Sequence, residues 1–137
     1  MIGTGKLKEE IMVKVKTYGI EENVKFLDVR DDVYKIYSAM DFFLFPSLHE
    51  GFPLTLIEAQ ASGLKIICSD RISENTNITK KIKYISLNKN AEYWANYILN
   101  LECTRNADIS ELYAQEYGDK ENAKLLEDVY LSNFNKL

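Results

Sequence analysis

The stretch DFFLFPSLHEGFPLTLIEAQASGLKIICS, residues 41–69, decides the fold. Its first part, 41–45, is an apolar run that ends at a proline, and this pattern predicts a strand buried on both faces. A helix is predicted over residues 53–62 with Gly63 as its stop, and residues 65–69 predict a second buried strand. Strand, helix and strand in this order are typical of a parallel α/β unit.

The rest of the chain continues the alternation of strands and helices. Residues 6–19 predict a helix with one apolar stripe, which consists of Leu7, Ile11, Val15 and Tyr18, and Gly19 provides its stop. A shorter helix is expected after a cap at Asp31 or Asp32, with an apolar face of Val33, Ile36 and Tyr37. The other predicted elements are strands over 24–27 and 83–87 and helices over 90–102 and 120–134.

These elements predict a Rossmann-like doubly wound parallel α/β sheet followed by C-terminal helices. We expect the sheet domain to occupy residues 1–102 and a helical extension over 103–137 to pack on it. The predicted first strand consists only of Met1 and Ile2, whereas a full strand needs about five residues. We therefore expect either that preceding sequence is missing or that this sheet has one fewer complete strand.

Composition narrows the classes of partner. The 137 residues fit one domain, and 46% hydrophobic residues are enough to form a core. With a net charge of −4 and no basic cluster larger than the pair Lys80 and Lys81, we expect no nucleic-acid partner and at most peripheral membrane contact. Neither a leader nor a run of 18 apolar residues is seen, so we expect a cytoplasmic protein at or near the inner face of the membrane.

The metal-ligating residue types are sparse. His49 is the sole histidine, and Cys68 and Cys103 lie far apart in unlike contexts, which predicts two reduced thiols and no metal site.

The loop between the first long strand and its helix is the predicted binding site. In sheets of this kind ligands lie beyond the carboxyl ends of the strands, where residues 46–52 form the connection. Pro53 suits the first helical position, and the free N–H groups of Leu54 and Thr55 then point toward the loop. Gly51 lets a ligand approach the backbone closely. The pattern predicts a cradle for phosphate.

Two acids extend this site. Over the helix, Glu58 lies about 7–8 Å beyond Pro53, and Glu50 precedes it by up to roughly 10 Å of loop. The two carboxylates are thus expected at the two ends of one cleft, with the helix N-terminus between them. A carboxylate accepts hydrogen bonds from both hydroxyls of a diol, so a nucleotide sugar, with ribose, diphosphate and hexose in a row, matches this layout.

The surroundings of Glu58 leave two interpretations open. Its helix is apolar on nearly every side, and we expect it to be a buried crossover helix. A lone buried carboxylate costs several kcal/mol unless it finds donors. Those donors are either the hydroxyls of a ligand or nearby backbone N–H groups.

The segment FPSLHEGFPLTLIEAQASGLKIICSD resembles the Glu-x7-Glu motif of retaining glycosyltransferases of family 4. The flanking stretches GTGKLKEEI and VKFLDVRDDVYKIYSAMDFFLFPS are also similar, and the tail NITKKIKYISLNKNAEYWANYIL resembles the bacterial capsular and exopolysaccharide branch. The resemblance covers about residues 1–102. It implies a GT-B architecture, in which two Rossmann-like halves face a cleft, and it makes this chain the donor-binding half.

The resemblance also implies roles for single residues. Glu50 matches the acid that lies against the donor sugar and stabilises positive charge at its anomeric carbon, and Glu58 matches the acid that holds the ribose hydroxyls. The backbone that meets sugar and diphosphate corresponds to Gly51, Phe52, Leu54 and Thr55. Further expected donor contacts are Val29 and Arg30 near the base, Ser47 near phosphate and Gly3 in a G-x-G turn.

For several of these residues a plain structural role stays open. Arg30 is equally well explained as a solvated side chain that caps the turn at Asp31 and Asp32, and Ser47 as a cap of its loop. His49 is interpreted as a neighbouring side chain that helps to shape the site and is not a catalyst.

Some features depart from the family pattern. Lys65 lies where the family often has proline. The family's basic pair that neutralises the diphosphate lies upstream of Gly3, in sequence that this chain lacks, and the acceptor-binding half is missing as well.

We therefore expect the donor-binding half of a transferase that moves a sugar from a UDP-sugar or GDP-sugar to a polysaccharide or lipid-linked acceptor. It is expected to need no cofactor or metal and to be inactive alone. The alternative is a non-catalytic nucleotide-sugar-binding module, or a subunit of a split transferase that pairs with a separate acceptor-binding subunit.

Overall fold

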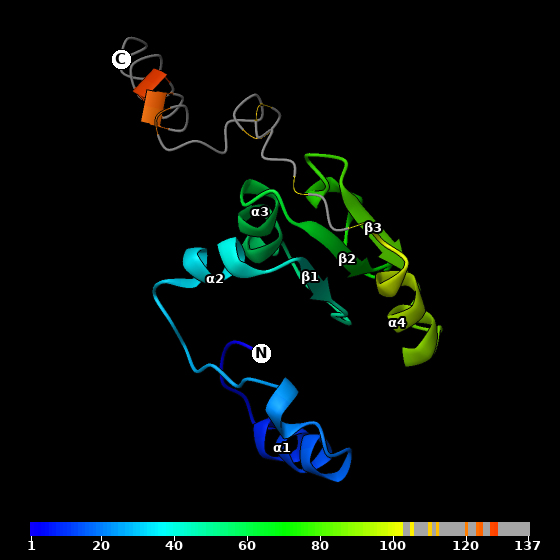
Figure 1. The fold of residues 1–137 in the computed structure, drawn as a ribbon. Helices are drawn as coiled ribbons and strands as arrows, with labels where there is room; N and C mark the ends of the chain where they lie inside the picture. The colour runs from blue at the N-terminus through cyan, green and yellow to red at the C-terminus, as the bar shows by residue number, and fades with distance from the viewer. Residues whose placement is uncertain are drawn as a thin grey trace. The chain divides into compact units, whose positions relative to one another are not determined.

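The computed structural model describes residues 1–102 and, beyond them, residues 105, 110, 112, 120, 123–124 and 127–128. The chain divides into two compact units, residues 1–36 and 37–137. Figure 1 follows it from blue at the N-terminus toward red. Cys103 and most of the helix predicted over 120–134 lie outside the described residues. The sequence-based division at residue 102 stays a prediction.

The first unit contains α1 (Lys8–Thr17) and a single 3-10 turn, η1 (Glu21–Asn23). Gly19 ends α1 as predicted: its φ of 64° is in the left-handed region that glycine tolerates best. The N–H groups of Gly19 and Ile20 donate back to the oxygens of Lys16 and Val15, which satisfies carbonyls at the helix end.

The apolar stripe predicted for α1 is only partly buried. Val15 is buried, whereas Leu7 is 64% exposed and Tyr18 is 73% exposed. The predicted strand over 24–27 is also wrong, because the structure has only an isolated parallel bridge between Ile2 and Leu27. Periodicity predicts the helix but not its burial, which depends on how much apolar surface the 36-residue unit offers it.

A short main-chain contact between residues 1–3 and 25–27 replaces the predicted strand. The N–H of Leu27 donates to the oxygen of Met1 at 2.7 Å, and the N–H of Gly3 donates to the oxygen of Leu27 at 2.9 Å. The terminal amino group of Met1 also donates to the main-chain oxygen of Lys25 at 2.6 Å. These three hydrogen bonds surround one isolated bridge and do not extend into a strand ladder.

The second unit contains a three-stranded parallel sheet in the order β1, β2, β3. These strands are β1 (Phe42–Phe45), β2 (Lys65–Ser69) and β3 (Ile82–Ile85). The register pairs Phe42 with Lys65 and Ile66 with Ile82. The parallel α/β fold predicted from the sequence is therefore confirmed.

Two helices flank this sheet, α3 (Leu54–Ala61) and α4 (Ala91–Leu99). Ile67 of β2, Ile85 of β3 and Trp94 of α4 form a buried cluster, so α4 covers the face that Ile67 presents. In the ribbon view α3 lies on the other side of the sheet (Figure 1). The strands are thus sandwiched, as their apolar composition requires.

Burial differs between the strands. In β2, residues 66–69 are all buried, as predicted. The prediction that β1 is buried on both faces is wrong, since Leu44 is 48% exposed. Within the described sheet β1 is an edge strand, and an edge strand has a neighbour on one side only.

The link from α3 to β2 is short and tightly closed. Gly63 has a φ of 70°, and its N–H donates to the oxygen of Gln60 while that of Leu64 donates to the oxygen of Ala59. These two bonds satisfy the last carbonyls of the helix, so the chain turns directly into the buried strand. The predicted stop at Gly63 is confirmed.

A buried amide holds α3 to the segment before β3. The side chain of Gln60 is 2% exposed and donates to the oxygens of Leu56 and Thr76 at 3.0 and 2.8 Å. Its own oxygen accepts from the N–H and the hydroxyl of Thr79, both at 3.0 Å. Because the amide is fully satisfied, it fixes the loop that contains the 3-10 turn η2 (Glu74–Thr76).

The remaining helix, α2 (Val33–Ala39), leads into β1. Tyr37 of α2 is 3% exposed, and its ring packs edge-on against Phe43 with centroids 5.6 Å apart. At the C-terminal end of α2 the Arg105 guanidinium donates to the oxygens of Tyr37, at 2.9 Å, and Met40. A cation at this end of a helix is favourable, and here it fixes the last turn.

Candidate functional site

The loop after β1 presents Glu50 to solvent. Glu50 is exposed, and its Oε1 accepts a 2.8 Å hydrogen bond from the hydroxyl of Ser47 in the same loop. The main-chain oxygen of Ser47 in turn accepts a 2.5 Å hydrogen bond from the hydroxyl of Ser69 at the end of β2. The loop at the carboxyl end of β1 is therefore tied to the neighbouring strand. Ser47, predicted as a donor contact or a loop cap, holds Glu50.

The N-terminus of α3 follows directly. Pro53 precedes the first helical residue with an extended ψ of 97° and supplies no side-chain hydrogen bond to the first turn. The helix thus begins at Leu54, one residue later than predicted, which is within the usual uncertainty of helix ends. Leu54 is 63% exposed and Thr55 is exposed. The first turn of α3 accordingly lies at the surface.

Glu58 lies one turn further along α3, and its environment differs from the prediction. The helix is not buried on nearly every side, because Leu54, Thr55, Glu58 and Ala61 form an exposed stripe. The opposite side, with Leu56 and Ala59, is fully buried. The apolar sequence of this helix does not reveal the exposed stripe, because leucine and alanine also occur at protein surfaces. The Glu58 carboxylate therefore pays no full desolvation cost.

Tyr37 holds the Glu58 carboxylate. Its hydroxyl lies 3.2 Å from Oε2 of Glu58 and 3.4 Å from the main-chain oxygen of Thr55, so one proton is shared between two acceptors. Burial raises the pKa of the Tyr37 phenol to about 12, and the charge of Glu58 beside it adds to the rise. The phenol therefore keeps its proton near neutral pH and acts as a donor.

The two acids share an arrangement that spacing alone does not reveal. Each is exposed, and each accepts a hydrogen bond from a hydroxyl that comes from a better-buried residue. Such a contact fixes the direction of a carboxylate and leaves its other lone pairs for a ligand. Whether Glu50 and Glu58 line one cleft stays a prediction.

Between the acids lies open, partly apolar surface. A Cβ added to Gly51 would meet nothing within 4 Å, so the backbone there is accessible. Phe52 is 48% exposed, and His49 is exposed with its main-chain oxygen 3.4 Å from the Ser47 hydroxyl. The predicted contact of Gly51 and Phe52 with a donor, and the role of His49 as a neighbour, stay predictions.

The interior behind the loop contains a thiol. Cys68 of β2 is fully buried, and this burial raises its pKa to about 11. The charge of Glu50 also favours the neutral thiol, whereas a main-chain hydrogen bond at Ser69 opposes the rise. Cys68 is thus a free, protonated core residue, in agreement with the sequence-based expectation for this cysteine.

The first unit contains the other three predicted site residues. Val29 is 77% exposed, and Gly3 has a φ of 106°. Arg30 pairs with Asp32, with its Nε and Nη2 at 2.7 and 2.9 Å from the two carboxylate oxygens. This hydrogen bond lowers the pKa of Asp32 and raises that of Arg30. The alternative role of Arg30, as a cap of the turn, is therefore realised.

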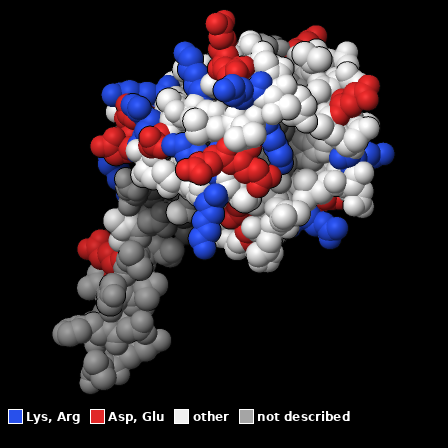
Figure 2. All heavy atoms as spheres, turned by 90° about the horizontal axis from the view of Figure 1, so that it is seen from below, with Lys and Arg blue, Asp and Glu red and all other residues white. Residues whose placement is uncertain are grey.

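Surface charges are mixed. In the first unit Lys8 pairs with Asp28 at 2.5 Å and Lys14 pairs with Glu10 at 2.9 Å. Figure 2 shows acidic and basic side chains intermingled over one face of the molecule. That face presents no large patch of a single sign, so strong electrostatic steering of a ligand toward it is not expected.

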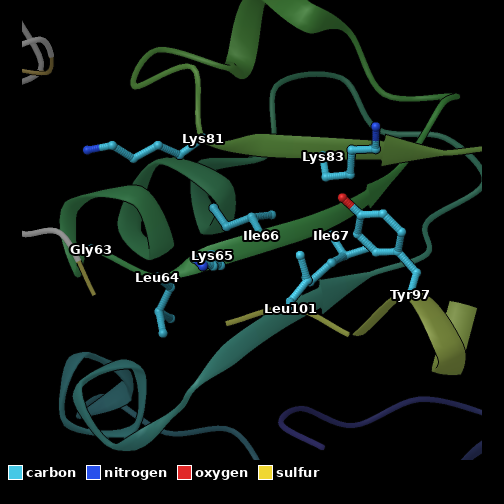
Figure 3. A pocket seen from close by; sticks show the side chains of 9 residues that line it. All are labelled: Gly63, Leu64, Lys65, Ile66, Ile67, Lys81, Lys83, Tyr97 and Leu101. Atoms are coloured by element: carbon cyan, nitrogen blue, oxygen red, sulfur yellow. The ribbon is translucent and has the colours of Figure 1, made fainter. Parts of the chain in front are cut away.

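A pocket of about 320 Å³ is lined by residues of β2, β3 and α4 (Figure 3). Lys65, Lys81 and Lys83 line it near the first residues of β2 and β3, and Tyr97 and Leu101 contribute from α4 and the segment after it. Lys65 donates from its ammonium group to the main-chain oxygen of Glu102, and Lys83 lies 5.7 Å from the Tyr97 ring centroid. Because this is the amino-terminal edge of the strands, the pocket is not the predicted donor site.

Two residues of the site escaped sequence reasoning, Tyr37 and Ser69. Tyr37 was predicted only as part of an apolar helix face, and Ser69 only as the end of a strand. A tyrosine in a buried position usually has a partner for its hydroxyl, and that was the available signal. Among the described residues no cluster of three or more His, Cys, Asp or Glu could hold a metal ion. No helix in the described part of the chain has the length and apolar character needed to cross a bilayer.

The sequence comparisons point to one class of enzyme. Residues 1–102 match the family described as "Glycosyl transferases group 1". The chain is 32% identical over 135 residues to the "Putative glycosyltransferase EpsF" of Bacillus subtilis (strain 168), covering 95% of this chain and 35% of that protein. It is 35% identical over 81 residues to a UDP-Gal:alpha-D-GlcNAc-diphosphoundecaprenol alpha-1,3-galactosyltransferase of Escherichia coli, covering 58% and 21%. The chain thus spans about a third or less of the length of these relatives.

Solved structures agree on the fold. The lipopolysaccharide outer core galactosyltransferase WaaB, in its apo form, superposes with a TM-score of 0.68 at 22% identity, covering 96% of this chain and 40% of that one. The pneumococcal O-GlcNAc transferase GtfA, in complex with UDP and GlcNAc, gives a TM-score of 0.55 at 21% identity, covering 98% and 28%. The Rossmann-like α/β fold is therefore shared with these glycosyltransferases.

Proposed function

Because the chain belongs to the glycosyl transferases group 1 family, we propose that it is the donor-binding half of a retaining GT-B glycosyltransferase of family 4. Its substrate is a UDP-sugar or GDP-sugar, and the acceptor is a polysaccharide or a lipid-linked sugar. The observation that supports this best is the pair of exposed carboxylates, Glu50 and Glu58, each held by a hydroxyl donor beside the N-terminus of α3. The proposal places the protein in the cytoplasm and requires no metal.

In this proposal Glu58 binds the ribose. Its exposed carboxylate has lone pairs left beyond the one that Tyr37 occupies, and these accept hydrogen bonds from the two ribose hydroxyls. Glu50 lies at the other end of the donor, against the hexose. There its negative charge stabilises the positive charge that develops at the anomeric carbon during transfer.

The diphosphate lies between the two acids. The first N–H groups of α3, at Leu54 and Thr55, receive no side-chain cap from Pro53 and are proposed to bind phosphate oxygens. Gly51 leaves room for this approach, and Phe52 contacts the donor from the same loop. The helix dipole adds a favourable interaction of about 0.3–1 kcal/mol with the negative charge.

Three further contacts belong to the first unit. We propose that Val29 meets the base through its main chain and that Gly3 contributes through the G-x-G turn. Arg30 contacts the donor only if it exchanges its pairing with Asp32 for the ligand. Donor binding by Arg30 therefore requires the loss of its ion pair with Asp32, and Val29 and Gly3 have no such pair to lose.

Binding by the 137-residue chain tests the proposal. UDP and GDP are titrated by calorimetry into the wild type, Glu58→Ala and the control Glu92→Ala, which removes an exposed acid of α4. Loss of a charged hydrogen bond is expected to weaken binding by about 1.5–3 kcal/mol in Glu58→Ala only. Equal affinities for all three proteins would remove Glu58 from the ribose, and no binding by the wild type would refute the proposal.

Transfer is expected to require more than this chain. The acceptor has to be placed and the leaving diphosphate has to be neutralised, and the residues proposed here provide only part of the second requirement. The chain alone is therefore expected to release no sugar from either donor. Sustained turnover by the isolated 137 residues would show that the donor half is sufficient for catalysis.

A further inference from the structure

Glu58 does not project from α3 unsupported, because a residue 21 positions earlier in the chain holds it. The Tyr37 hydroxyl donates toward Oε2 of Glu58 at 3.2 Å. The ring of Tyr37 is 3% exposed and packs edge-on against Phe43 at 5.6 Å, with an interplanar angle of 82°. Phe43 in turn stacks on Phe45 at 5.7 Å. The donor is therefore anchored in the aromatic face of β1, whereas the carboxylate that it holds is exposed.

The backbone below this ring is fixed as well. The main-chain oxygens of Tyr37 and Met40, in and just after the last turn of α2, both accept hydrogen bonds from the guanidinium of Arg105. The position of Tyr37 is thus fixed by contacts with β1, with α3 and with the guanidinium of Arg105. A donor placed in this way does not have to be ordered again when a ligand binds.

The protonation state makes the contact directional. Since the pKa of Tyr37 is raised, its hydroxyl remains a donor and does not accept a hydrogen bond from Glu58. One lone pair of Oε2 is engaged, and Oε1 together with the remaining lone pair of Oε2 is left for donors from outside. Two vicinal hydroxyls of a ligand are the groups that match two neighbouring acceptors held in a fixed plane.

We propose that Tyr37 is a positioning residue that orients the Glu58 carboxylate for the vicinal diol of a ribonucleotide and so sets the preference for ribose over deoxyribose. This inference rests on the proposed donor-binding function. Tyr37 itself does not touch the ligand. It acts through Glu58, and its effect is seen only with ligands that have both hydroxyls.

The test uses pairs of ligands that differ in the diol alone: UDP with 2′,3′-dideoxy-UDP, and GDP with its 2′,3′-dideoxy counterpart. Calorimetry compares the wild type, Tyr37→Phe and the control Tyr97→Phe, which removes a phenol oxygen from α4 on the other side of the sheet. Tyr37→Phe is expected to lower the affinity for the ribonucleotide about three- to tenfold. Its affinity for the dideoxy ligand and both affinities of Tyr97→Phe are expected to stay within about twofold of the wild type.

A double-mutant cycle separates positioning from general stability. In a Glu58→Gln background, Tyr37→Phe is expected to change the ribonucleotide affinity by less than about twofold, because the group that it positions has already changed. Thermal unfolding confirms that each variant is folded at the titration temperature. If Tyr37→Phe is not folded, the inference is still refuted by a wild type that shows no preference for the diol, or by a preference that Glu58→Gln leaves unchanged.

The outcomes distinguish the inference from the function on which it rests. A wild-type chain that binds neither UDP nor GDP refutes the proposed function and the inference together. Binding without preference for the diol in the wild type refutes the inference, as does a preference that persists unchanged in folded Tyr37→Phe. A preference lost in Tyr37→Phe and retained in Tyr97→Phe supports the inference.

Discussion

Ser69 donates a 2.5 Å hydrogen bond from its hydroxyl to the main-chain oxygen of Ser47, and this contact joins the end of β2 to the loop that contains Glu50. Ser69 is fully buried, and its oxygen also accepts from the N–H of Arg71 at 3.3 Å. Both partners are main-chain groups. The serine therefore links the loop after β1 to the loop after β2 at the carboxyl edge of the sheet. The candidate site includes the first of these loops.

Ser69→Ala is expected to lower the free energy of unfolding by about 1–2 kcal/mol, since one hydrogen bond is lost and the Ser47 oxygen loses a donor. It should also weaken nucleotide binding, because the loop around Glu50 loses its tie to β2. Urea unfolding and calorimetry measure the two effects. Ser86→Ala is the control, because its hydroxyl makes a longer 3.4 Å contact with the N–H of Asn88. An equal effect of both substitutions would contradict the prediction.

Gln60 is expected to be a structural residue with no part in ligand binding. Its buried amide donates to the main-chain oxygens of Leu56 and Thr76 and accepts from the N–H of Thr79. Truncation to alanine leaves several of these main-chain groups without that partner. Gln60→Ala is therefore expected to cost at least about 2 kcal/mol in the free energy of unfolding.

The exposed Asn88→Ala serves as the control for Gln60 and should stay within about 0.5 kcal/mol of the wild type. Chemical denaturation measures both variants. If folded Gln60→Ala bound UDP much more weakly while its stability hardly changed, the assignment would be wrong.

Gly51 and Gly19 are expected to respond to alanine in opposite ways. Gly51 has open space around its added Cβ, so Gly51→Ala should leave the melting temperature unchanged but weaken nucleotide binding where the backbone meets the diphosphate. Gly19 has a φ of 64°, so Gly19→Ala should lower stability by about 1 kcal/mol and leave binding intact. Thermal unfolding and titration of both variants provide the comparison. Unchanged affinity in Gly51→Ala would argue against close backbone approach.

Cys68 is expected to make stability depend on alkaline pH. Its folded-state pKa of about 11 lies above the ordinary value of 9.0, so folding favours the neutral thiol. This contribution is complete below pH 9.0 and is lost as the pH rises through about 11, because the unfolded chain releases the proton first.

The test compares two proteins, namely the single variant Cys103→Ser and the double variant that carries both Cys103→Ser and Cys68→Ala. The stability advantage of the protein that keeps Cys68 should shrink as the pH rises from 9.0 to about 11. Urea unfolding across this range measures it. An advantage that stays constant would contradict the raised pKa, and rapid alkylation of Cys68 in the native protein at about pH 8 would contradict its burial.

Local sequence signals predicted much of the fold. The glycine stops at Gly19 and Gly63 and the buried strand β2 follow from short-range chemistry, and all three are confirmed. The predicted strand over 24–27 is not formed, because its pairing with the segment around Ile2 is limited to one isolated bridge at Leu27. The burial of Leu44 failed for a related reason, since hydrophobicity does not reveal which strand lies at the edge of a sheet.

The candidate site shows the same division between local and distant signals. Motif spacing singled out Glu50, Gly51 and Glu58, and all three are exposed, although Glu58 was expected on a buried helix. The hydroxyls that hold the two acids depend on contacts between distant segments, as in the pairs Tyr37 with Glu58 and Ser69 with Ser47. No periodicity in one sequence encodes such a pair, because each partner obeys the rules of its own element.

The link from Arg105 to α2 has a consequence for the order of events during biosynthesis. The oxygens that receive the guanidinium belong to residues 68 and 65 positions earlier, so synthesis of the intervening sheet precedes this contact. A nascent chain that is arrested before Arg105 lacks the guanidinium that binds the main-chain oxygens at the end of α2. The contact that fixes the last turn of α2 therefore depends on a residue that is synthesised after all three strands.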